Sequence, residues 1–162
     1  MPLDVPFALG PFTVDAIGRL APLRPDASPG FLFRWRDRIV RARMMQPGAA
    51  AEGRLLLQVP LGRIPSSAKR TDAASRPDSF ALLRLMAQTF PPAWRLLLLP
   101  DHRVRLETDA SLALPITAVG LLVETTQFLL ALAPFLDMFD ETGMAVPERV
   151  SAAAGIAKTW PG

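Results

Sequence analysis

A run of arginines between residues 34 and 43 is the feature of this sequence with the clearest chemistry. Its members are Arg34, Arg36, Arg38, Arg41 and Arg43. A guanidinium pairs bidentately with carboxylates and phosphates. On a hairpin, alternate members of the run share a face and form a basic strip. Such a strip binds the acidic side chains of a protein, binds the phosphates of RNA, or is a solvated face that blocks edge-to-edge aggregation.

Three aromatic residues alternate with these arginines and predict a strand with one apolar face from Phe31 to Trp35. Two interpretations are open. The rings form pockets for a strand or helix of a partner, or they are the core side of the strand. For partner binding, the candidate residues are Phe31, Phe33, Trp35, Arg34, Arg36, Arg41 and Arg43.

Groups suited to catalysis are sparse in this chain. There is no cysteine and no tyrosine, and His102 is the one histidine. The lack of cysteine excludes disulfides, thiolate metal sites and thiol nucleophiles. His102, next to Asp101, suits a turn better than acid–base chemistry. The sequence has no Walker loop and no GxGxxG, HExxH or GxSxG motif. We therefore predict no catalytic residue, no cofactor and no enzymatic activity; an unrecognised site around His102 or Glu124 is the remaining alternative.

Carboxylates gather at Glu107 and Asp109, and again at Asp137, Asp140 and Glu141. Asp137 and Glu141 are four residues apart, so they share one face of a helix. Neither group has a histidine or another convergent ligand. We interpret the second group as a solvated helix end and predict no Mg²⁺ or Ca²⁺ site.

The composition indicates one folded domain, because 50% of the 162 residues are apolar and 20% are charged. The net charge of +3 favours acidic partners but is smaller than is usual in a nucleic-acid domain. Pro2, Pro6 and Pro11 make the N-terminus a poor signal peptide. Glu124 interrupts the apolar run 112–139, and a charge at bilayer depth is costly. We expect a cytoplasmic protein without a membrane span.

Hydrophobic periodicity sets the expected elements. These are a short helix at 13–21, strands at 31–35, 39–45 and 53–61, a helix at 79–90 and a hairpin within 94–108. A long helix follows from 116 to 133, with a prolonged or kinked segment through 139. A single long strand is the alternative for 31–45, because no glycine marks a turn there. Pro60 is expected to end its strand or to place it at a sheet edge. The four leucines at 96–99 predict a strand covered on both faces.

This order predicts an α+β fold. An antiparallel sheet of about five strands is packed by a long C-terminal helix, in the order α-β-β-β-α-β-β-α. We expect a single domain over residues 1–143 and a loosely held tail over 144–162.

Four stretches carry a resemblance to a known family: LLLQVPLGRIP, SFALLRLMAQTF, WRLLLLPDHRVRLE and ALPITAVGLLVETTQFLLALAPFLDMF. In this order, within residues 13–142, they resemble the class I type III secretion chaperones and their structural relatives. The resemblance implies a small bacterial homodimer. Such a protein keeps a segment of a secreted client extended along its surface.

The predicted C-terminal helix carries more apolar surface than one sheet face needs, and such a surplus is usually buried by a partner. We expect a homodimer through Leu121, Phe128, Leu132 and Phe135. The predicted function is that of a protein-binding adaptor that buries apolar side chains of a client and pairs arginines with its carboxylates. Binding of single-stranded RNA by the arginine strip is the alternative.

Overall fold

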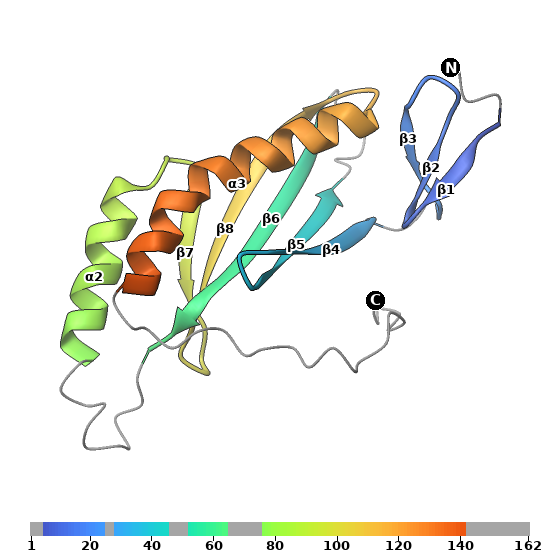
Figure 1. The fold of residues 1–162 in the computed structure, drawn as a ribbon. Coiled ribbons are helices and arrows are strands. Elements are labelled where there is room, and N and C mark those ends of the chain that lie inside the picture. Colours follow the sequence, from blue (N-terminus) through green and yellow to red (C-terminus); the bar gives the residue numbers. More distant parts are fainter. Residues whose placement is uncertain (1–4, 25–27, 46–51, 65–75, 142–162) are drawn as a thin grey trace.

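The computed structural model describes residues 5–24, 28–45, 52–64 and 76–141 of the chain. Over these ranges the protein has an α+β fold with two antiparallel sheets and a long C-terminal helix (Figure 1). The predicted tail at 144–162 lies outside the described residues.

The first sheet is small and contains β1 (Phe7–Leu9), β2 (Phe12–Val14) and β3 (Leu20–Pro22). The helix predicted over 13–21 is therefore wrong. The Asp15 carboxylate accepts hydrogen bonds from the N–H groups of Ile17 and Arg19, at 3.0 and 2.8 Å. Gly18 has a φ of +81°, which favours glycine. An aspartate-closed turn thus reverses the chain where a helix needs it to continue.

The second sheet has five strands in the order β4-β5-β6-β8-β7. Their bounds are Gly30–Trp35 for β4, Arg38–Met45 for β5, Glu52–Arg63 for β6, Trp94–Leu98 for β7 and Arg103–Ala113 for β8. Both predicted hairpins are present. Arg36 and Asp37 form the two-residue turn between β4 and β5, with φ values of 45° and 59°. Positive φ at both positions matches the twist of a tight hairpin.

Two expectations about strand position are wrong. β6 is a central strand, paired with β5 and β8, and it continues past Pro60. The register shifts between Pro60 and Gly62, and this irregularity accommodates a residue that has no N–H to donate. β7 is an edge strand, and Leu98 is 49% exposed. The run of leucines therefore does not indicate a strand covered on both faces.

Two helices, α2 (Arg76–Thr89) and α3 (Ala118–Glu141), lie on one side of the five-stranded sheet, with α2 beside the C-terminal half of α3 (Figure 1). The inner side of α3 is apolar apart from one threonine, and its buried residues are Leu121, Thr125, Phe128, Leu132, Leu136 and Phe139. Ring contacts of 4.8 to 5.7 Å join β7, α3 and the residue that follows α2 through Phe90, Trp94, Phe128 and Phe135. These contacts fix the two helices against one face of the sheet.

The small sheet is attached to the first turn of α3 and to β4. The N–H of Leu20 donates to the carbonyl of Ile116 at 2.7 Å, and the N–H of Ala118 donates to the carbonyl of Gly18 at 3.0 Å. The rings of Phe12 and Phe31 meet edge to face at 6.2 Å. The two sheets therefore share one apolar core.

Candidate protein-binding surfaces

The two faces of the five-stranded sheet differ in composition because neighbouring residues on a strand point to opposite faces. On β5, Val40, Ala42 and Met44 are buried beneath the helices, whereas Arg41 and Arg43 are exposed. The strands β6 and β8 alternate in the same way. Within the described ranges, no helix or strand lies over the second face (Figure 1).

We call this uncovered surface the arginine face. Strand register places eight arginines on it: Arg34, Arg41, Arg43, Arg54, Arg63, Arg95, Arg103 and Arg105. Partly exposed aliphatic side chains lie between them, namely Leu32, Ile39, Met45, Leu56 and Leu97. The strands place no aromatic residue on this face. It therefore combines positive charge with aliphatic surface.

Two carboxylates in the middle of the arginine face hold several of its side chains in place. Asp109 pairs with Arg54 at 2.9 Å and with Arg95 at 2.7 Å. Glu107 pairs with Arg105 at 2.7 Å and accepts a hydrogen bond from Gln58 at 2.6 Å. The acids are only 21% and 13% exposed, whereas Arg54 and Arg95 are more than half exposed. Carboxylates beneath thus orient guanidinium groups that still face solvent.

The candidate partner-binding residues from the sequence do not share one surface. Register pairs Phe31, Phe33 and Trp35 with Ala42, Val40 and Arg38, on the side that faces the helices. There the three rings are partly buried and pack against the core. Of the two interpretations of the aromatic residues, the core one fits this placement. Arg34, Arg41 and Arg43 lie on the opposite face.

Two members of the arginine run bind the end of α3 and are not part of the arginine face. Arg36, in the hairpin turn, pairs with Asp137. Arg38 is 4% exposed and pairs with Asp140 at 2.5 Å, with a weaker contact to the carbonyl of Leu61. Two of the three carboxylates interpreted as a solvated helix end, Asp137 and Asp140, are therefore counter-ions that fasten α3 to the β4–β5 hairpin.

The residues predicted to form the dimer interface are occupied within the chain. Leu121, Phe128 and Leu132 are 9%, 6% and 0% exposed against the chain's own sheet. Phe135 packs on the rings of Phe90 and Trp94. This side of α3 cannot receive a second copy without opening the core.

The opposite side of α3 is apolar and exposed. Its large aliphatic residues, which we call the α3 outer row, are Val119, Leu122, Val123 and Leu130, at 71%, 66%, 44% and 68% exposure. The four residues that the sequence predicts for a dimer interface lie on the inner side of α3, whereas the exposed aliphatic residues lie on the outer side. The sequence pattern does not show which side of α3 faces the sheet, because large apolar residues occur on both sides of the helix.

Acid–base catalysis and metal binding both need titratable side chains that converge, and His102 is the one histidine of the chain. His102 has a φ of 64° in the β7–β8 turn, where its N–H donates to the carbonyl of Leu99. In the part of the chain that the structure describes, no three His, Cys, Asp or Glu side chains are placed to hold a metal ion.

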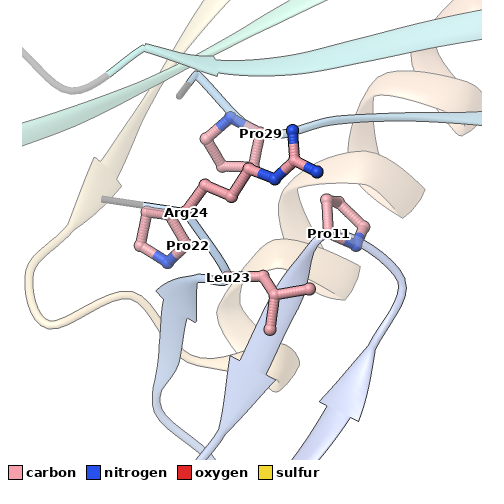
Figure 2. Close-up of a pocket in the computed structure, with 5 residues that line it drawn as sticks. All are labelled: Pro11, Pro22, Leu23, Arg24 and Pro29. Carbon is pink, nitrogen blue, oxygen red and sulfur yellow. The ribbon is translucent and has the colours of Figure 1, made fainter. Parts of the chain in front are cut away.

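A small pocket of about 130 Å³ lies where the small sheet meets β4 (Figure 2). Its lining residues are Pro11, Pro22, Leu23, Arg24 and Pro29. Typical ligand sites have volumes of about 300 Å³ or more and several convergent polar groups. With Arg24 as its one polar side chain, this pocket does not match that type of site.

Among the described helices, α3 is long and apolar enough to cross a membrane, with a mean hydropathy of 1.7 over its most apolar window. Length and composition alone do not distinguish such a span from the core helix of a soluble protein. In this fold six residues of α3 are buried against the sheet.

Comparison of this chain with protein-family models, with curated proteins and with solved structures gives no match. The surfaces described above therefore provide the grounds for a functional proposal.

Five arginines of the arginine face, Arg54, Arg63, Arg95, Arg103 and Arg105, are absent from the candidate residues chosen from the sequence. Arg103 and Arg105 are two residues apart in a predicted strand, followed at the same spacing by Glu107 and Asp109. This alternation indicates one polar face. It does not show that β8 lies beside β6, because that pairing joins segments about fifty residues apart.

Proposed function

We propose that this chain is a protein-binding module without catalytic turnover, which associates with a second copy of itself and holds a segment of another protein. The observation that carries the proposal is the α3 outer row. Large aliphatic residues in contiguous exposed positions on a folded domain usually mark a surface that another protein covers.

The spacing along α3 favours a second copy as the occupant. Positions 119, 123, 126, 130, 133 and 137 follow one another at alternate intervals of four and three residues on the outer side. Intervals of this kind produce a seam along which two helices pack side by side. Val119, Val123 and Leu130 supply its apolar contacts. Thr126 and Ala133 are small enough for close approach of the two helices.

Charges at the two ends of the seam are complementary in an antiparallel pair. Arg19 is exposed and forms an isolated β-bridge with Thr117, the residue that precedes α3. This bridge places Arg19 beside the first turn of the helix. Glu141 is exposed in the last turn of α3, and Asp137, which also pairs with Arg36, lies one turn before it. An antiparallel second copy brings Arg19 of each chain towards the acidic helix end of the other. A parallel pair places like charges together at both ends.

Photo-crosslinking in the producing cell tests the proposal. The photoreactive amino acid benzoylphenylalanine replaces Leu130 in the outer row or, as a matched control, Leu85 on α2, which is 58% exposed. We expect light-dependent protein adducts at position 130, including one that contains two copies of this chain, and far fewer at position 85. Equal yields at the two positions, or lipid adducts alone at position 130, would refute the proposal.

A further inference from the structure

We propose that the arginine face binds an acidic segment of a partner protein that also carries aliphatic side chains. The inference rests on the proposed function, because it assigns a surface and a chemical class to the segment that the module holds.

The charge of this face determines the class of partner. Register places eight arginines on its strands together with two carboxylates, Glu107 and Asp109. The turn acids Asp37 and Asp101 pair with Arg34 and Arg103. Eight arginines against these four carboxylates leave an excess of four positive groups among the described residues of this face. The arginine face is thus net positive, and a ligand there gains most from being acidic.

The arginines that Asp109 orients are suited to incoming carboxylates. A guanidinium has five N–H donors, and a single carboxylate engages two of them at most. Arg54 and Arg95 share Asp109 and are 57% and 58% exposed, so donors remain directed at solvent. Because their conformations are already restricted, less side-chain entropy is lost when a second carboxylate binds.

The apolar part of the face distinguishes a polypeptide from a nucleic acid. Sites for single-stranded nucleic acid stack bases on exposed aromatic rings. The sheet places Phe31, Phe33, Trp35 and Trp94 on the helix-covered face instead. Between the arginines lie Leu32, which is 59% exposed, and the half-buried Leu56 and Leu97. Aliphatic side chains of a peptide have matching contacts there, whereas a phosphate backbone has none.

Fluorescence anisotropy on the full chain tests the inference with three probes. The first is a labelled peptide that alternates Glu or Asp with Leu or Val, and the second replaces every acid by its amide. The third is a single-stranded oligonucleotide of matched length. We expect the acidic peptide to bind at least about 10-fold more tightly than the amide peptide, a difference of about 1.4 kcal/mol. We also expect it to bind more tightly than the oligonucleotide.

Paired variants assign the binding to this face. Arg54→Gln with Arg95→Gln should weaken the acidic peptide at least about 10-fold, whereas Arg84→Gln on α2 should have no effect. Leu32→Gln removes aliphatic contact and leaves the ion pairs of the face intact, and we expect about a 3-fold loss. This second variant keeps the test valid if the double variant does not fold.

Several outcomes would overturn the inference. One is equal binding of the acidic and amide peptides, and another is tighter, steeply salt-dependent binding of the oligonucleotide. A third is a loss of peptide binding in the Arg84→Gln variant as large as the loss in the double variant of Arg54 and Arg95. Sedimentation of the same samples separates this failure from failure of the proposed function. A protein that still self-associates but ignores acidic peptides contradicts this inference alone.

Discussion

The two faces of the five-stranded sheet are built from alternate residues of the same strands, yet they have opposite properties. On β6, Leu57 is fully buried beneath the helices, whereas the neighbouring Leu56 lies partly exposed among arginines. The covered face is closed by α2 and α3 and has little further capacity to bind. Alternate residues of each strand therefore serve different purposes: those under the helices stabilise the fold, and those on the arginine face are available for binding. Single substitutions can probe one property without the other.

The largest effect that separates the faces is expected from two adjacent leucines. Leu57→Ala leaves a cavity in the core and should lower the free energy of unfolding by about 2–5 kcal/mol. Leu56→Ala removes the same atoms from the arginine face and should cost about 1 kcal/mol or less. Urea denaturation monitored by circular dichroism measures both. Similar losses in the two variants would mean that both faces are closed.

A smaller difference is expected between the two ion pairs that fasten α3 to the β4–β5 hairpin. A double-mutant cycle on Arg38 and Asp140 should give a coupling of about 1–3 kcal/mol, because Arg38 is 4% exposed. The half-exposed Asp140 side chain keeps this coupling below that of a fully buried pair.

The Arg36–Asp137 pair is the matched control for that cycle, since it joins the same elements but is 41% and 61% exposed. Its coupling should be about 0.2–1 kcal/mol. Equal couplings for the two pairs would show that burial of Arg38 adds nothing to the attachment of α3.

The smallest effect concerns the turn that joins β4 to β5. Asp37 has a φ of 59°, which glycine adopts without cost. Asp37→Gly should therefore raise the free energy of unfolding by about 0.5 kcal/mol, even though an exposed pair with Arg34 is lost. Asp37→Ala loses the same pair and retains the strain, so thermal denaturation should show it to be less stable than the wild type. A destabilised glycine variant would contradict the turn assignment.

The sequence was sufficient to predict the elements that depend on local patterns. Alternation defined β4 and β5, and the apolar periodicity of residues 116–139 predicted α3. Contacts between distant segments overturned other expectations. Residues 13–21 form the end of β2, a turn and the start of β3, because Asp15 caps the chain reversal and Gly18 permits it. Such a short segment has no intrinsic tendency to remain helical.

The binding surfaces were predicted only in part, for two physical reasons. The arginine run could be recognised in the sequence. Which of its side chains lie on the arginine face depends on how residues alternate along the two strands that flank the Arg36–Asp37 turn. Arg38 therefore points beneath the helices, although Arg41 does not. On α3, the inner side carries leucines and phenylalanines, and the outer side carries leucines and valines. Only the packed sheet shows that Leu132 is inside and Leu130 outside.

Sedimentation equilibrium of the full chain tests the central claim most directly, namely that protein covers the α3 outer row. We predict twice the chain mass of 17.6 kDa at micromolar concentrations. Leu130→Arg should restore the mass of a single chain, and Leu85→Arg on α2 should leave the doubled mass unchanged. A wild-type mass of 17.6 kDa up to about 100 µM would contradict the account. So would a dimer that Leu130→Arg does not weaken.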